Sequence, residues 1–258
     1  MRKHLLPHIL IISVLFLLAS TAQVASYAGE MEFYKEEVRK NPDDALAHFG
    51  LGLAYDDLGE VKEAIKSYKH AIRIDPNIAG AHYLLGIAYG DLGKFKEAIK
   101  SYKQAIRIDP DDADVHVDLG AAYGKTGMTE KAIKSFKKAI RKSPDNALAH
   151  SMLGYTYGEL GKWKEAIKSC KQAIRINPDD ADAHNNLGIA YVNLDKYQEA
   201  IKSYKQAIRI DPDDADAYYG LGIAYELLND RDSALEQYKI LKKLDTGVAN
   251  ELFNVIYE

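Results

Sequence analysis

The chain has 258 residues, of which 47% are hydrophobic and 28% charged, and its formal net charge is −4 at pH 7. A weakly acidic chain of this kind gives no reason to expect nucleic-acid binding, which requires a concentrated basic surface. A single cysteine, Cys170, excludes an intramolecular disulfide.

The first 28 residues differ from the rest of the chain. Arg2 and Lys3 give a positive start, an apolar run covers residues 9–18, and small and polar residues follow up to Ala28. This order is typical of a secretory signal peptide, and the apolar run is about half of the ~20 residues that a membrane-spanning helix needs. We therefore expect residues 1–28 to be a signal peptide and the protein to be exported, to a periplasmic or extracellular space. The alternative is an uncleaved N-terminal membrane anchor.

The next segment, residues 29–44, is expected to be a linker and an N-terminal capping helix. Phe33, Tyr34 and Val38 give residues 31–40 an apolar side, which predicts a lone helix. Such a helix would cover the open end of whatever structure follows it.

From residue 45 onward the chain repeats itself. A proline recurs every 34 residues, at Pro42, Pro76, Pro110, Pro144, Pro178 and Pro212. A helix-forming chain punctuated at this period is the signature of a solenoid of two-helix repeats. The period predicts six tandem repeats, over residues 45–78, 79–112, 113–146, 147–180, 181–214 and 215–246.

The second repeat shows how each is built. Its first half has the spacing i, i+3, i+4, i+7 of one helix face, and its second half forms another such face. Gly93 lies between the halves and suits the left-handed residue that ends a helix. The two faces consist of His82, Leu85, Gly86 and Tyr89, and of Ala98, Tyr102 and Ala105.

This pattern resembles the tetratricopeptide repeat, whose motif is aromatic-x-x-Leu-Gly-x-x-Tyr followed by Ala, an aromatic residue, Ala and Pro. The first repeat matches at Leu51, Gly52, Tyr55, Ala64, Tyr68, Ala71 and Pro76. The sequence departs from the motif where histidine replaces the opening aromatic residue in five repeats, and where Cys170 replaces the second aromatic residue. The resemblance implies an all-α, right-handed superhelical solenoid of helix-turn-helix repeats.

The last segment, residues 247–258, is expected to be a C-terminal capping helix. Its apolar residues fall on one face, and a solenoid needs a helix that covers its last open side. These residues are Val248, Leu252, Val255 and Ile256.

Three patterns look chemical but have simpler interpretations. The histidines recur once per repeat, and packed helices lie ~8–10 Å apart, too far for neighbours to share a zinc ion with bonds of ~2 Å. Residues 120–126 lack the glycine spacing of a phosphate-binding loop. The aspartates of residues 109–114 lack the glycine and distal glutamate of a calcium loop and are expected to cap a helix. We assign no catalytic, cofactor-binding or metal-binding residues and expect no cofactor.

A second apolar stripe runs beside the core face of the first helices, where a surface helix is normally polar. In tetratricopeptide proteins these positions line a concave groove, so the resemblance implies a groove here as well; the alternative is that they pack on adjacent first helices. Acidic residues and two amides lie beside the stripe. The candidate partner-binding residues are Phe49, Leu53, Asp56, Tyr83, Ile87, Asp91, Asp118, Tyr155, Glu159, Asn185, Asn186, Tyr219 and Ile223.

Together these features predict a non-enzymatic scaffold or adaptor that binds a polypeptide segment in an apolar groove with an acidic edge. The partner is expected to be neutral or basic with apolar anchors. A basic stripe on the second helices, such as Lys100, Lys103 and Arg107, leaves an alternative open: a membrane-tethered assembly factor that recruits an envelope complex through its convex face. Contact with the membrane is expected only through an uncleaved N-terminus. An enzymatic reading is disfavoured, because repeats and caps occupy nearly all of residues 31–258.

Overall fold

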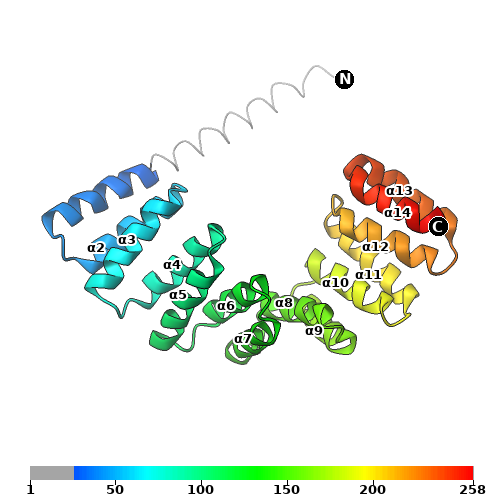
Figure 1. Ribbon diagram of the computed structural model, residues 1–258, viewed down its shortest axis with the longest axis horizontal. Helices are drawn as coiled ribbons and strands as arrows, with labels where there is room; N and C mark the ends of the chain where they lie inside the picture. Colours follow the sequence, from blue (N-terminus) through cyan, green and yellow to red (C-terminus); the bar gives the residue numbers. More distant parts are fainter. Residues whose placement is uncertain (1–25, 258) are drawn as a thin grey trace, which may run out of the picture. The chain divides into compact units, whose positions relative to one another are not determined.

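The computed structural model describes residues 26–257, and every regular element in that range is a helix (Figure 1). Residues 1–25, which hold most of the expected signal peptide, lie outside the described part. A helix runs through residues 26–40, so it is longer than the expected capping helix: it also takes in residues 29–30, which were assigned to a linker, and residues 26–28, which were assigned to the signal peptide. The helices that follow are α2 (Ala45–Asp57), α3 (Val61–Ile74), α4 (Ala79–Asp91), α5 (Phe95–Ile108), α6 (Ala113–Lys125), α7 (Thr129–Lys142), α8 (Ala147–Glu159), α9 (Trp163–Ile176), α10 (Ala181–Val192), α11 (Tyr197–Ile210), α12 (Ala215–Glu226), α13 (Arg231–Leu244) and α14 (Thr246–Tyr257).

The chain forms two compact bodies, which we describe separately. The N-terminal body extends to Asp111 and contains helices up to α5, and the C-terminal body begins at Asp112 and contains α6 to α14. Within each body the two helices of a repeat contact each other, and the second helix also contacts the first helix of the next repeat. The architecture is therefore the all-α solenoid of helix-turn-helix repeats that the 34-residue period predicts.

Acidic and amide side chains start most of the first helices. The Asp112 carboxylate accepts hydrogen bonds from the backbone N–H groups of Asp114 and Val115, at 2.9 and 3.4 Å. Asp44, Asn146, Asp180 and Asp214 act in the same way at α2, α8, α10 and α12. Each cap is worth about 1 kcal/mol, which explains the aspartate clusters without a calcium ion.

The turn between the two helices of a repeat needs a left-handed residue. Glycine supplies it in the first four repeats, with φ values of 67–73°. Asp195 and Asn229 occupy the same position in the last two repeats, with φ of 58° and 59°. Left-handed backbone is costlier for a residue with a Cβ than for glycine.

Inside a repeat, a large side chain of the second helix lies on a glycine of the first helix. A Cβ added to Gly86 would lie 2.5 Å from a ring carbon of Tyr102, so the glycine makes room for the tyrosine ring. In the fourth repeat the Cys170 sulfur takes the place of the ring against Gly154. Burial raises the pKa of the Cys170 thiol to about 12, which makes this cysteine an inert packing residue.

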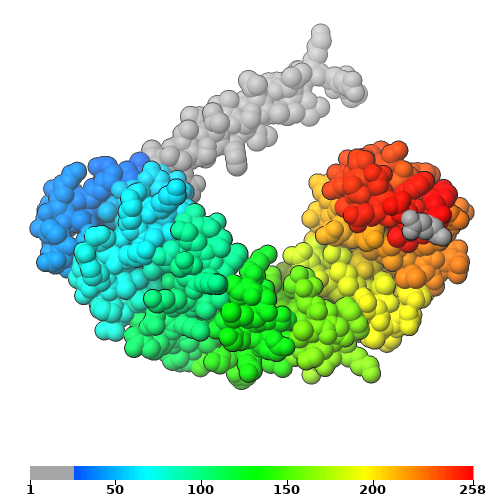
Figure 2. All heavy atoms as spheres, in the orientation of Figure 1, coloured from blue at the N-terminus to red at the C-terminus, as the bar shows by residue number. Residues whose placement is uncertain are grey.

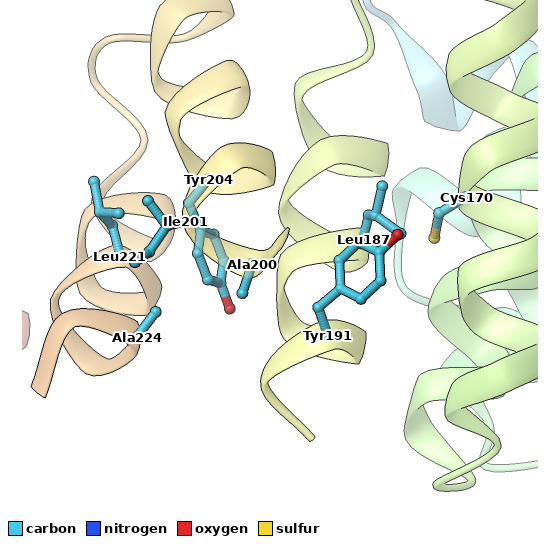
Figure 3. Packing of buried hydrophobic residues seen from close by; sticks show 8 residues of the cluster. All are labelled: Cys170, Leu187, Tyr191, Ala200, Ile201, Tyr204, Leu221 and Ala224. Atoms are coloured by element: carbon cyan, nitrogen blue, oxygen red, sulfur yellow. The ribbon is translucent and has the colours of Figure 1, made fainter. Parts of the chain in front are cut away.

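The core of the C-terminal body continues from repeat to repeat. Figure 3 shows one stretch of it, in which Tyr204 of α11 points between α10 and α12. The same cluster joins residues of α9 to α12, namely Cys170, Leu187, Tyr191, Ala200, Ile201, Tyr204, Leu221 and Ala224. No repeat in this body buries its apolar face alone, as expected for a solenoid.

Helix α14 covers the last repeat (Figure 2, red). Its Leu252 and Ile256 are buried against α12 and α13, and Leu252 lies on Gly222 of α12. Arg231 of α13 donates a hydrogen bond to the Ile256 carbonyl oxygen, and its guanidinium carbon lies 4.5 Å from the ring centroid of Tyr257. The end of the solenoid is thus closed by packing and by a specific polar contact.

Candidate binding surface

The first helices of the C-terminal body lie next to one another in chain order. Helix α8 contacts both α6 and α10, and α10 also contacts α12. A pocket of about 530 Å³ opens on the surface that they share. It is lined by apolar side chains at Ala121, Met152, Tyr155 and Ile189, and by polar ones at Lys125, Ser151, Thr156, Glu159, Asp182, Asn185, Asn186 and Asp216, with further residues from α7.

Four of the residues expected to bind a partner line this pocket, namely Tyr155, Glu159, Asn185 and Asn186. The Tyr155 side chain is 51% exposed and Ile189 is 40% exposed, although both are large and apolar. Such side chains bury large areas when a partner covers them. The repeat spacing brings these residues together because equivalent positions of successive first helices fall on one surface.

Three other candidates of the C-terminal body lie outside the pocket. Tyr219 and Ile223 of α12 pack against the apolar cluster formed by α13 and α14, which leaves both half-buried. Asp118 of α6 is also half-buried and does not line the pocket. Helices α13 and α14 therefore bury part of the Tyr219 and Ile223 side chains, which were expected to contact a partner.

In the N-terminal body the second stripe is partly used for packing. The rings of Phe49 and Tyr83 each lie 6.0 Å, centroid to centroid, from the tyrosine of the second helix of their own repeat. Phe49 also lies close to Gly80 of the next first helix. Leu53 is 38% exposed and Ile87 is half-buried. Phe49 and Tyr83 therefore pack at least in part within the repeats, whereas Leu53 keeps an exposed apolar surface.

Asp56 points into its own repeat. The hydroxyl of the buried Tyr68 donates a hydrogen bond of 3.1 Å to the Asp56 carboxylate. Burial raises the pKa of the Asp56 carboxyl, and the hydrogen bond from Tyr68 partly opposes that shift. This carboxylate holds a tyrosine in place, whereas Asp91, the other acidic candidate of this body, is exposed.

Two acidic residues of the pocket, Asp182 and Asp216, were not among the sequence candidates. Asp182 and Asp216 lie in the first turns of α10 and α12, two residues after the N-caps. Aspartates at this place were attributed to helix capping. The sequence could have indicated Asp182, because the helical spacing i, i+3, i+4 puts it on the same face as Asn185 and Asn186.

The repeated histidines have an internal role. The Nε2 atom of His82 lies 3.1 Å from the Pro76 carbonyl oxygen, and three other repeats have the same contact at 3.0–3.1 Å. Each histidine thus ties its first helix to the turn that precedes it. Over residues 26–257 no three His, Cys, Asp or Glu side chains converge as a metal site would require.

Part of the basic stripe also contacts other repeats. The Lys69 ammonium lies 5.4 Å from the ring centroid of Tyr89, and the Lys205 ammonium 5.6 Å from that of Tyr225. Each lysine belongs to a second helix and each tyrosine to the next repeat. These lysines therefore stabilise the junction between consecutive repeats, and they also give the second helices their positive charge.

The sequence model described as TPR repeat matches residues 54–93, 88–127, 126–161, 155–195 and 190–229, and a further tetratricopeptide repeat model matches 216–245. The chain belongs to the tetratricopeptide repeat family. A search of curated proteins found no match. Tetratricopeptide repeats bind other proteins or peptides, so the chain is suited to act as an interaction scaffold. Among residues 26–257, no helix combines the length and the apolar character needed to span a bilayer.

Solved tetratricopeptide structures share the fold. YrrB, described as a TPR protein with an unusual peptide-binding site, is 23% identical, with a TM-score of 0.63 over 71% of this chain and 95% of YrrB. MamA is 30% identical, with a TM-score of 0.58 over 64% of this chain and 97% of MamA. Pseudomonas aeruginosa pilF is 22% identical, with a TM-score of 0.70 over 81% of this chain and 96% of pilF.

Proposed function

We propose that this protein is a non-enzymatic scaffold that binds a segment of another polypeptide on the surface formed by its first helices. The observation that carries the proposal is the pocket on α6, α8, α10 and α12. Its volume lies in the range of about 300–1,000 Å³ that is typical of ligand pockets. Exposed Tyr155 and Ile189 offer apolar contact, and the amides of Asn185 and Asn186 offer hydrogen bonds to a peptide backbone.

The partner of this surface is neutral or basic and carries apolar anchors. An acidic partner would meet the carboxylates of Glu159, Asp182 and Asp216 in the pocket, and like charges brought together oppose binding. Aromatic and aliphatic side chains of the partner would pack on Tyr155 and Ile189, in the way that buried anchors dominate interface energies.

Binding is tested by capture of partners from an exported-protein extract with purified protein. We expect Tyr83→Ala combined with Tyr155→Ala to remove most of the captured partner while the far-ultraviolet circular dichroism spectrum stays helical. Tyr197→Ala is the matched control, because Tyr197 begins α11 and lies outside the pocket. Unchanged capture by the double variant, together with loss of capture on charge reversal at Lys100, Lys103 and Arg107, would instead favour the convex face.

The proposal places the protein outside the cytoplasm, on the basis of the signal-like order of residues 1–28. N-terminal sequencing of the protein from its native host tests this. A mature N-terminus between Thr21 and Met31 supports export with cleavage. Recovery of a chain beginning at Met1 from the membrane fraction would favour the tethered form.

A further inference from the structure

The pocket on α6, α8, α10 and α12 carries an excess of negative charge. Its ionisable lining residues are Lys125, Glu159, Asp182 and Asp216, so three carboxylates face one ammonium group. The carboxylates come from three different helices, with Glu159 at the end of α8 and the two aspartates in the first turns of α10 and α12. A recess with this charge favours a cationic group over a neutral one of the same size.

One polar atom beside the pocket lacks a partner. The side-chain oxygen of Asn185 is shielded from solvent, and no donor within residues 26–257 reaches it. A buried acceptor that is left unpaired costs free energy, and rotation of the Asn185 amide toward an N–H donor in the pocket recovers it. Asn185 lies one turn of α10 beyond Asp182, so a donor group held by the Asp182 carboxylate is also near the amide.

The pocket also has walls for an uncharged stem. Met152 and Ile189 offer aliphatic surface, and the exposed ring of Tyr155 offers an aromatic face. A cation held against such a ring gains an attraction, and the planar guanidinium group makes such contacts more often than the ammonium group because it also stacks on the ring face. A long side chain with an apolar stem and a cationic tip combines all of these contacts.

On these observations, and on the premise of the proposed function, we infer that this pocket is the subsite for an arginine side chain of the bound polypeptide. Arginine presents five N–H donors in a fixed plane, and the pocket presents acceptors on separate helices. Lysine has the same charge but a compact ammonium group, so it satisfies fewer of these acceptors at once.

The test uses three synthetic pentapeptides, acetyl-Ala-Leu-X-Leu-Ala-amide, in which X is arginine, lysine or citrulline. Citrulline has nearly the shape of arginine without its charge. Each peptide is titrated into nitrogen-15-labelled protein, and the dissociation constant is read from the NMR shifts of the Asn185 side-chain amide and of the Tyr155 and Ile189 backbone amides. We expect the arginine peptide to bind about tenfold more tightly than the citrulline peptide at low salt, with lysine between them.

The charge requirement is tested with Asp182→Asn combined with Asp216→Asn, which should bring the arginine and citrulline peptides to nearly equal affinity. Asp232→Asn is the matched control, because Asp232 is an exposed first-turn aspartate of α13 outside the pocket and should leave the preference intact. Circular dichroism verifies that each variant is folded.

Several outcomes overturn the inference. They are equal binding of arginine and citrulline, a preference that survives the double aspartate variant, lysine binding as tightly as arginine, or no shift of the pocket resonances with any peptide. In each case the capture experiment with the Tyr83 and Tyr155 variants still decides the scaffold function separately.

Discussion

Lys171 of α9 lies over the ring of Tyr191 of α10, with 5.6 Å between the ammonium nitrogen and the ring centroid. Lys171 belongs to the fourth repeat and the buried Tyr191 to the fifth, so their contact crosses the junction between the two repeats. The same contact recurs at a spacing of 20 residues between Lys35 and Tyr55, Lys69 and Tyr89, Lys137 and Tyr157, and Lys205 and Tyr225. Four of these lysines occupy the same position of a second helix, and Lys35 makes the equivalent contact from the N-terminal helix.

Removal of one such lysine should weaken a junction. Lys171→Met keeps the length of the stem but loses the cation, and we expect the free energy of unfolding to fall by about 0.5–1 kcal/mol. Urea unfolding measures the change. Lys168→Met is the control on the same helix: both lysines are exposed, but it is Lys171 that lies over the Tyr191 ring, so Lys168→Met should change stability by much less. Equal effects of the two substitutions would show that the contact with Tyr191 adds nothing.

Two glycines of α4 should respond to alanine in opposite directions. A Cβ at Gly86 would lie 2.5 Å from the Tyr102 ring, whereas one at Gly90 would have its nearest neighbour at 3.9 Å. We expect Gly86→Ala to destabilise the protein by about 1–3 kcal/mol through overpacking. Gly90→Ala should stabilise it by about 0.5–1 kcal/mol, because alanine is the better helix former. Thermal unfolding that ranks the variants in the other order would contradict the packing described.

The histidines are expected to stabilise turns and to bind no metal. His82→Phe keeps an aromatic ring but removes the hydrogen bond to the Pro76 carbonyl oxygen, at a cost of about 0.5–1.5 kcal/mol in unfolding free energy. Isothermal titration of Zn²⁺ into untagged protein should reveal no tight stoichiometric site. A submicromolar site that disappears in His116→Phe would assign these residues to a metal instead.

Asp56 should make stability depend on pH. Burial raises the pKa of its carboxyl in the folded protein above the ordinary value of 3.8. The folded state therefore binds this proton more tightly than the unfolded state, and the associated stability is present at low pH and is lost as the pH rises through the folded pKa. Asp56→Asn removes the titration and retains an acceptor for the Tyr68 hydroxyl.

The measurement is urea unfolding of both proteins at about pH 3.5 and at about pH 7. Relative to the natural protein, Asp56→Asn should be more stable at the higher pH than at the lower one. A difference that is independent of pH would mean that the carboxyl titrates alike in the folded and unfolded chains.

The repeats were readable from the sequence because their signals are local and occur six times. A proline precedes every repeat, and a left-handed turn residue and a helix face recur in each, so one departure such as Cys170 does not disturb the pattern. Of the residues that line the pocket, the sequence singled out Tyr155, Glu159 and the two asparagines as partner-binding candidates. Asp182 and Asp216 were missed because an aspartate near a helix start is explained equally well by capping.

Other residues depended on contacts between elements. Whether Asp56 faces a partner or its own repeat depends on the Tyr68 hydroxyl, which lies 12 residues away on another helix. Tyr219 carries the same pattern as Tyr83, but α14 packs on its surroundings, and no other repeat is followed by such a helix. Sequence periodicity describes what the repeats share, so it is least informative where the array ends.

The contacts of the Tyr204 ring restrict which insertions and deletions this chain can accept. The ring lies against Gly188 of its own repeat and also against Gly220 of the next one, so a single side chain belongs to both sides of a junction. Removal of residues 181–214 takes out one whole period and leaves the arrangement of the turns and caps unchanged. Shortening by 33 or 35 residues leaves one residue too many or too few, which within a helix turns the rest of that helix by about 100° and moves its apolar face off its partners. Natural length variants of this protein should therefore differ by whole multiples of its period.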